Sequence, residues 1–273
     1  MASADLKRLL ENVEKVIVGK PETVKLLIVG LLTNSHILIE DVPGLGKTML
    51  GLSLSKSING DFKRIQFTPD LLPSDVTGGF IYNLKSGEFD FKQGPVFTNL
   101  LLADEVNRTT PRTQSALLEC MQEYKVTADG KTFSLPQPFM VIATSNPIEY
   151  QGVYPLPEAQ IDRFLMKINM GYLSIPQELE VISGQKVKHP IESLGAVMDL
   201  EKVLELQEEV KKIEISPHIL EYIVKLISST REKKERIKLG ASPRASIALM
   251  KASCAWAFIE GRDYVIPEDI TKL

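Results

Sequence analysis

The chain has 273 residues, of which 44% are hydrophobic and 25% are charged, values that are ordinary for a globular protein. This length suits one large domain with a smaller companion. The formal net charge of −3 excludes the strongly basic balance that binding to nucleic acid or to an anionic membrane would favour.

The cysteines and the N-terminal residues both favour a cytoplasmic protein. Cys120 and Cys254 lie far apart, with no Cys or His at ligand spacing, which favours buried apolar roles over a disulfide or a metal site. Residues 1–5 lead into no signal-peptide pattern. The longest apolar stretches, such as residues 26–32, fall far short of the roughly twenty residues that a membrane span needs. We therefore expect no membrane insertion.

The first two-thirds of the chain alternates short apolar runs with helical patterns, which is typical of a parallel sheet covered by helices. Runs this short and apolar suit strands buried on both faces. The expected core strands are residues 37–39, 64–67, 100–103, 139–143 and 164–168.

Two further segments predict hairpins inserted between these units. Residues 80–91 alternate around a Ser-Gly turn, and residues 124–133 do the same around Asp-Gly. After Tyr172 the pattern becomes helical almost throughout. We expect an α/β domain with two hairpin insertions over residues 1–172, a linker helix and connection over 173–195, and a helical domain over 196–273.

The most specific signal follows the first expected strand, where residues 41–48 read Asp-Val-Pro-Gly-Leu-Gly-Lys-Thr before a helical pattern. Such a loop turns backbone N–H groups toward phosphate oxygens at a helix N-terminus. The glycines allow close approach, the lysine reaches the β- and γ-phosphates, and the threonine hydroxyl can ligate magnesium. These residues are Gly44, Gly46, Lys47 and Thr48. The strict pattern opens with glycine, where this chain has Asp41.

Two more strands end in polar residues, and strand ends of an open parallel sheet are where ligands bind. Asp104 follows four apolar residues, so its carboxylate suits a magnesium ion held together with Thr48. Glu105 can orient or deprotonate a water at the γ-phosphate, and Asn146 can hydrogen-bond that water or the phosphate. An isolated Asp-Glu pair is more often a helix cap, but the phosphate loop favours the functional interpretation.

Two arginines complete the candidate site. Arg244 follows Ser242, an expected N-cap, and a cation at a helix N-terminus gains most from a nearby anion. Arg163 could reach a phosphate of a neighbouring subunit or pair with Asp162 or Glu158. From the residues alone, an ordinary ion pair explains either arginine equally well.

Several segments together resemble the MoxR family of AAA+ ATPases, and the resemblance covers nearly the whole chain. It implies the AAA+ P-loop NTPase fold, an α/β architecture in which a parallel sheet covered by helices is followed by a small all-α lid domain. The longest segment in common is highly specific. The segments are residues 40–48, 66–78, 104–108, 114–119, 143–164 and 239–246.

The resemblance also implies roles for individual residues. Asn146 matches the sensor-1 position, Arg163 the arginine finger that acts across a subunit boundary, and Arg244 the sensor-2 arginine of the lid. The expected catalytic residues are Glu105, Asn146, Arg163 and Arg244, with Thr48 and Asp104 as magnesium ligands. The residues expected to bind ATP are Val18, Gly19, Pro43, Gly44, Leu45, Gly46, Lys47, Thr48, Met49 and Arg244.

The family further implies a hexameric ring that uses ATP and Mg²⁺ to remodel or activate partner complexes, often with a von Willebrand factor A domain. Three alternatives stay open: a ring acting on nucleic acid, a chelatase-type motor subunit and a nucleotide-gated scaffold. The hairpin tips balance lysine against acidic residues, which disfavours nucleic acid as the partner. Related proteins carry another helix after residues 267–270, so an incomplete lid is a further expectation.

Overall fold

The computed structural model describes residues 2–147, 153–185, 189–233, 235 and 237–273. A five-stranded sheet lies at its centre, in the order β2-β5-β8-β1-β9, and every neighbouring pair of strands is parallel. The strands are β1 (Ile37–Glu40), β2 (Phe62–Gln66), β5 (Leu100–Asp104), β8 (Met140–Ser145) and β9 (Met166–Ile168). All five expected core strands are therefore present.

Side chains alternate across the three central strands, as strands buried on both faces require. One face carries Ile37, Ile39, Leu100, Leu102, Met140 and Ile142 into a first core. The other face carries Leu38, Leu101, Ala103, Val141 and Ala143 into a second core. The edge strand β2 departs from this expectation, because Lys63 and Arg64 are exposed and only Ile65 is buried.

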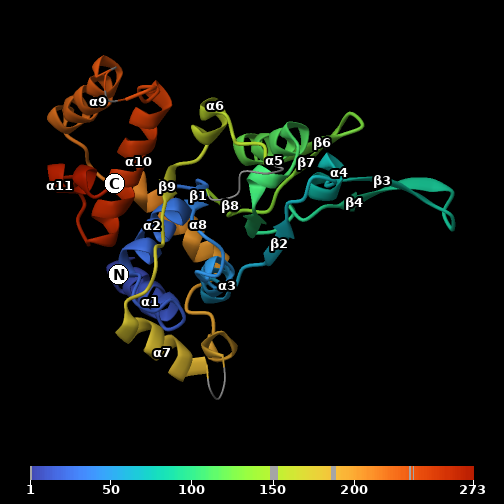
Figure 1. The fold of residues 1–273 in the computed structure, drawn as a ribbon, viewed down its shortest axis with the longest axis horizontal. Coiled ribbons are helices and arrows are strands. Elements are labelled where there is room, and N and C mark those ends of the chain that lie inside the picture. Colours follow the sequence, from blue (N-terminus) through green and yellow to red (C-terminus); the bar gives the residue numbers. More distant parts are fainter. Residues whose placement is uncertain (1, 148–152, 186–188, 234, 236) are drawn as a thin grey trace.

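Helices cover both faces of the sheet (Figure 1). The first core is closed by α1 (Ala2–Glu14), α2 (Pro21–Leu32) and α3 (Lys47–Ser57), and the second mainly by α5 (Pro111–Glu123). Shorter helical elements are α4 (Pro73–Thr77), the 3₁₀ turn η1 (Val106–Arg108), α6 (Glu158–Ile161) and the 3₁₀ turn η2 (Pro190–Ser193). The helix α7 (Ile175–Gln185) follows the last strand.

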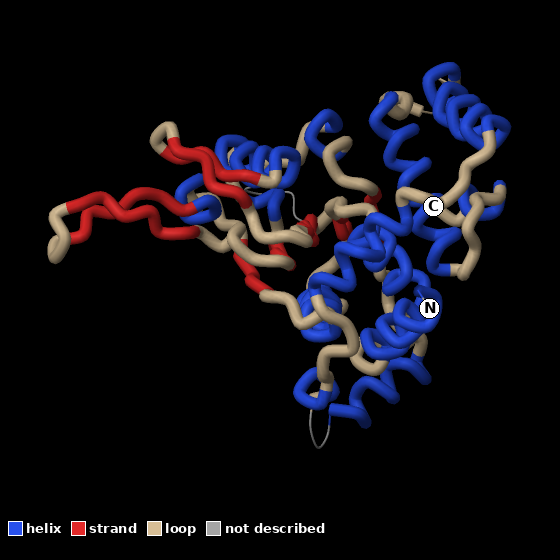
Figure 2. The backbone as a smooth tube through the Cα atoms, turned by 180° about the vertical axis from the view of Figure 1, so that it is seen from behind, coloured by secondary structure: helices blue, strands red, loops and turns tan. Residues whose placement is uncertain are grey.

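Both expected hairpins are present and extend away from the sheet (Figure 2). They are β3 (Gly78–Asn83) with β4 (Glu88–Gln93), and β6 (Lys125–Ala128) with β7 (Lys131–Ser134). Phe91 of the first hairpin stacks on Phe133 of the second, with ring centroids 4.0 Å apart. Aromatic stacking therefore joins the two insertions where they leave the body of the protein.

The remaining helices form an all-α part: α8 (Leu200–Val210), α9 (Pro217–Glu232), α10 (Pro243–Ile259) and α11 (Pro267–Thr271). The first core runs on into them without a break, taking in Val203, Ile223 and Ala255. The Gln207 side chain of α8 donates to the Leu31 carbonyl of α2 at 2.7 Å. The helical part is thus packed on the back of the α/β part, and the boundary expected at residue 196 stays a prediction. None of the helices in the described part combines the length and hydropathy that crossing a bilayer requires.

A buried histidine fixes the start of β1. His36 is 3% exposed, its Nε2 lies 2.8 Å from the Met121 carbonyl, and the Val141 amide donates to its Nδ1 at 3.0 Å. One nitrogen must therefore donate while the other accepts, which is the neutral ring. Burial lowers the pKa of His36 to about 4, and the hydrogen bond to the Met121 carbonyl opposes that shift.

This histidine predicts an acid-sensitive fold. Above about pH 6.5 the ring is neutral in both states, and below it the unfolded chain takes up a proton that the native state refuses until about pH 4. The free energy of unfolding should fall by about 2 kcal/mol between pH 6.5 and 5, measured by urea denaturation. His36→Gln should remove that part of the slope, whereas the exposed His218→Gln should not. Parallel curves for wild type and His36→Gln would contradict the prediction.

Candidate active site

The loop between β1 and α3 has the conformation that its glycines dictate. Gly44 and Gly46 have φ values of +86° and +85°, and a Cβ added at either would meet no atom within 4 Å. Glycine is therefore required here by backbone conformation and not by lack of space. Gly46 is the residue before α3, so the first backbone amides of that helix face the same loop, where the helix dipole favours an anion.

Asp41 stands where the generic loop has glycine, and its side chain has a distinct structural task. Its Oδ2 accepts hydrogen bonds from the backbone amides of Met170 and Gly171, both at 2.7 Å, and its Oδ1 accepts from the Val42 amide at 2.9 Å. The carboxylate thereby ties the start of the phosphate loop to the chain that leaves β9. Hydrogen bonds to a charged acceptor are the stronger kind, which accounts for an acid at this position.

Lys47 is the first residue of α3. Its side chain is folded back so that Nζ donates to the Asp41 backbone carbonyl. Burial lowers the pKa of Lys47, and the negative charges of Asp41, Asp104 and Glu105 oppose that shift. A partly desolvated ammonium group beside the glycine loop is well suited to an anionic ligand, which would replace the carbonyl as its partner.

Three strand ends meet the loop around a cavity of about 260 Å³. The cavity collects most of the expected phosphate, metal and catalytic residues, which come from segments separated by up to a hundred positions. It is lined by Pro43, Gly44, Gly46, Lys47, Thr48, Met49, Arg64, Gln66, Asp104, Glu105 and Asn146.

The donor set in this cavity fits a magnesium ion. A hydroxyl and a carboxylate, from Thr48 and Asp104, are the oxygen ligands that Mg²⁺ takes alongside substrate phosphates and water. Among the described residues, no group of three or more His, Cys, Asp or Glu side chains is arranged to hold a metal on its own. An ion here would therefore depend on phosphate oxygens for much of its coordination.

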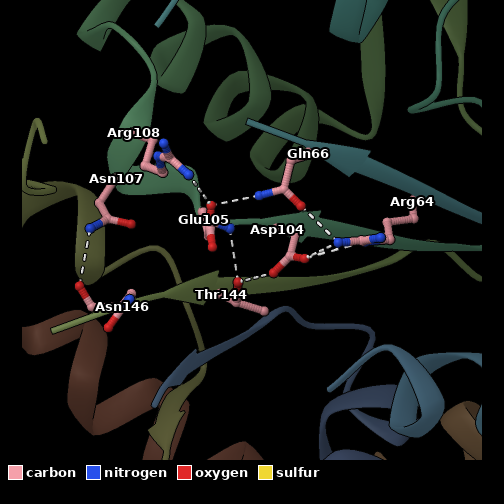
Figure 3. Close-up of polar contacts among 8 residues, drawn as sticks. All are labelled: Arg64, Gln66, Asp104, Glu105, Asn107, Arg108, Thr144 and Asn146. Carbon is pink, nitrogen blue, oxygen red and sulfur yellow. Dashed lines mark hydrogen bonds and ion pairs between the residues drawn. The ribbon is translucent and has the colours of Figure 1, made fainter. Parts of the chain in front are cut away.

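The acidic pair is held by a network that the sequence did not predict (Figure 3). The Thr144 hydroxyl donates to Asp104 Oδ1 at 2.6 Å and accepts from the Glu105 amide at 2.8 Å. Arg64 donates to Asp104 Oδ2 at 2.6 Å. Because Asp104 follows four apolar residues, the sequence predicted that its carboxylate has a positively charged partner. Within the chain, that partner is Arg64.

Glu105 is anchored through one carboxylate oxygen. Its Oε2 accepts from Gln66 Nε2 at 2.6 Å and from Arg108 at 2.9 Å. Its backbone has a φ of +58°, an uncommon left-handed conformation that turns the side chain at the end of β5. Nearby, Asn146 is 6% exposed and its backbone carbonyl accepts from the Asn107 side chain at 3.3 Å.

A second cavity, of about 420 Å³, opens beside the phosphate loop and has the size of a small-molecule site. Of the residues expected to bind ATP, it is lined by Val18, Gly44, Leu45, Gly46 and Met49, together with residues of α7. Gly19 lies beside it and accepts a hydrogen bond from Gln177 at 3.4 Å.

The two remaining arginines lie elsewhere. Arg163 and Arg244 line a third cavity, of about 320 Å³, and neither lines the phosphate cavity. Ser242 caps α10 as expected, accepting from the Arg244 amide at 3.0 Å, and its hydroxyl donates to Asp162 at 2.8 Å. The Asp162 carboxylate lies 3.9 Å from the Arg244 guanidinium. The anion at this helix N-terminus is thus Asp162.

Comparisons with known proteins place this geometry in a family. Residues 36–166 match the model of the ATPase family associated with various cellular activities (AAA), and residues 229–273 match the AAA lid domain. YeaC of Bacillus subtilis is 54% identical over 268 residues, which cover 98% of this chain and 83% of that protein. Chaperone MoxR1 of Mycobacterium tuberculosis is 44% identical over 276 residues, covering 98% of this chain and 73% of that protein. The chain belongs to the MoxR family of AAA ATPases.

The fold agrees with this assignment. A crystal structure from Cytophaga hutchinsonii superposes with a TM-score of 0.88 at 45% identity, covering 99% of this chain and 84% of that one. Membership of the MoxR family implies nucleotide binding. The α/β sheet followed by a helical lid is confirmed. Residues 148–152, inside the longest segment of the MoxR resemblance, lie outside the described residues.

Sequence analysis missed four residues of the MoxR-type site: Arg64, Gln66, Thr144 and Arg108. A usable signal existed for two of them. Arg64 and Gln66 are two positions apart in a run taken as a buried strand, so they share a face, and β2 pairs with β5 so that Gln66 lies opposite Asp104. Two polar residues on one face of a short strand indicate an edge strand or a site.

Asp41 yields a test in which the generic motif and this structure disagree. Asp41→Gly restores the glycine of the strict phosphate-loop pattern, yet it removes the hydrogen bonds to Met170 and Gly171. We expect the free energy of unfolding to fall by about 1–3 kcal/mol and nucleotide affinity, measured by calorimetry, to fall about tenfold or more. Asp41→Asn, which keeps one acceptor oxygen, should lie between. Wild-type affinity in Asp41→Gly would show that the carboxylate is incidental.

Proposed function

We propose that this MoxR-family chain hydrolyses ATP at sites shared between the subunits of a ring and uses the energy to remodel partner proteins. One observation carries the proposal. The phosphate loop, Asp104, Glu105 and Asn146 surround one cavity, whereas Arg163 and Arg244 surround another. A chain arranged in this way supplies half of a catalytic site on each of two faces.

In the proposed site, the phosphates of ATP lie against the amides of the glycine loop and the start of α3. Lys47 exchanges its bond to the Asp41 carbonyl for the β- and γ-phosphate oxygens. Thr48 and Asp104 would hold Mg²⁺, which supplies positive charge to the phosphates when bound. The adenine then occupies the larger cavity, beside Val18 and α7.

Glu105 orients the attacking water and accepts its proton. Its carboxylate is already fixed at one oxygen by Gln66 and Arg108, which restricts the directions in which it can point. Asn146 hydrogen-bonds the water or the γ-phosphate from the neighbouring strand end. Arg64, now paired with Asp104, adds a second positive charge to the phosphate cavity.

Arg163 and Arg244 act on the nucleotide of the adjacent subunit. Both line one cavity, which no residue of their own phosphate loop lines. The Arg163 Nε is buried without a hydrogen-bond partner among the described residues, and its NH1 makes only a long bond of 3.3 Å to the Leu118 carbonyl. An arginine with unused N–H donors can stabilise the negative charge that develops on ATP bound to the adjacent subunit.

The remodelling role draws on the relative named Chaperone MoxR1. A hexameric ring, and a client with a von Willebrand factor A domain, extend the proposal as the family resemblance suggests. The β3–β4 hairpin supports a protein client, because its apolar side chains Ile81, Tyr82, Leu84 and Phe89 are all more than half exposed. Such a tip favours contact with polypeptide over the phosphate backbone of nucleic acid.

Steady-state ATPase activity tests the shared site. Activity per subunit should rise with protein concentration, fall about 10³–10⁵-fold in Arg163→Ala and fall about 10²–10⁴-fold in Glu105→Gln, while both variants still bind ATP. Arg8→Ala, which removes an exposed arginine of α1, is the control and should be fully active.

Mixing the two inactive variants in equal amounts is the sharper measurement. A site is intact when its own subunit carries Glu105 and the neighbour carries Arg163, so roughly a quarter of wild-type activity should return in a ring built from repeated interfaces. No recovery on mixing, together with activity independent of concentration, would place the whole site within one chain.

A further inference from the structure

The helix α7 carries an apolar stripe without cover. Ile175, Leu179 and Ile182 are 78%, 60% and 62% exposed, and Tyr172, just before the helix, is 77% exposed. The spacing of four and three residues puts Ile175, Leu179 and Ile182 on one side of the helix. No described side chain of α7 is buried. An isolated helix of 11 residues is marginal in water, so this stripe calls for a partner surface.

The position of the stripe limits what that partner can be. Glu178, Val181 and Ile182 of α7 line the larger nucleotide cavity together with the phosphate-loop residues Gly44 and Gly46. In Figure 1, α7 lies at the edge of the molecule below the end of α1. Whatever covers α7 therefore also lies at the opening of the nucleotide site, where the proposed function requires an adjacent copy of this chain.

A separate surface on α10 matches the α7 stripe. Arg244, Ile247 and Lys251 are spaced by three and four residues, are all exposed, and line the cavity that also contains Arg163. Ile247 is 53% exposed. The α10 face therefore presents one apolar side chain between two positively charged ones. By contrast, α7 carries two acidic residues, Glu178 and Glu180, and no basic residue. The two surfaces complement each other in charge and in apolar character.

We propose that the α7 stripe of one subunit packs on the α10 face of the next, an inference that rests on the proposed function. Ile175 and Leu179 would cover Ile247, and Glu178, which lies three residues from Ile175 on the same side of the helix, would face Lys251. Because the two surfaces are different, the contact is head-to-tail and can close into a ring. The same contact brings the cavity of Arg163 and Arg244 to the open side of the neighbour's nucleotide.

Assembly of substituted chains tests this pairing. Ile175→Glu/Leu179→Glu alters the stripe at two positions that line neither nucleotide cavity. Ile247→Glu alters the α10 face and leaves Arg163 and Arg244 in the sequence. Sedimentation velocity with Mg²⁺ and a slowly hydrolysed ATP analogue should show both variants as monomers under conditions where wild type assembles. Both should still bind nucleotide and should keep wild-type thermal unfolding, which excludes misfolding as the cause.

Matched controls put the same charge on equally exposed apolar positions elsewhere. Val224→Glu on α9, where the side chain is 54% exposed, is the counterpart of Ile247→Glu. Leu84→Glu/Phe89→Glu on the β3–β4 hairpin, where the side chains are 90% and 66% exposed, is the counterpart of the double α7 variant. Both controls should assemble like wild type. Loss of assembly in the controls as well would indicate a general effect of added charge and overturn the assignment.

Mixing the α7 variant with Ile247→Glu gives the decisive result. The α10 face is intact only in the α7 variant, and the α7 stripe is intact only in Ile247→Glu, so the two chains can form one interface with each other. The mixture should therefore sediment as a dimer and recover ATPase activity. Absence of a dimer overturns the proposal. If wild type assembles and the α7 variant assembles equally well, the ring stands and this interface is wrong. If wild type stays monomeric yet hydrolyses ATP, the shared-site function itself fails.

Discussion

Parallel pairing of β5 with β8, and of β8 with β1, is the constraint on which the candidate site depends. Parallel strands end at a common edge, so three segments far apart in sequence deliver their polar residues to one cavity. Thr144 makes the register chemically specific, because one hydroxyl both donates to Asp104 and accepts from the Glu105 amide. A shift of one residue would turn these side chains toward the apolar cores.

Much of this arrangement was predictable because its signals are local. Apolar runs of three to five residues indicated the strands, Ser-Gly and Asp-Gly turns indicated the hairpins, and Gly44 and Gly46 indicated a loop that phosphate can approach closely. The rule that ligands bind at parallel strand ends then gathered Thr48, Asp104 and Asn146 in one place. Their contributions to hydrolysis stay predictions, since geometry places a residue without measuring what it does.

The unpredicted features all depend on contacts between distant segments. Asp41 looked like a defect in a motif, because its partners Met170 and Gly171 lie about 130 positions away. Arg244 carries no local sign that its carboxylate neighbour is Asp162, which lies on the α/β part. Gln66 was hidden within a run counted as apolar. In each case the sequence shows that a polar or charged side chain requires a partner. Which residue is the partner depends on tertiary packing.

The continuous first core has a mechanical meaning. Leu27 of α2, Leu50 of α3, Val203 of α8 and Ala255 of α10 belong to one buried cluster, and close-packed interiors transmit strain with little compression. Sliding the lid across the sheet would open that cluster to water. A subunit built in this way resists internal shear, so in the proposed ring any movement driven by ATP would be a rotation of whole subunits about their contacts. The two hairpins, which are joined by the stacking of Phe91 on Phe133, would then move together as one rigid unit.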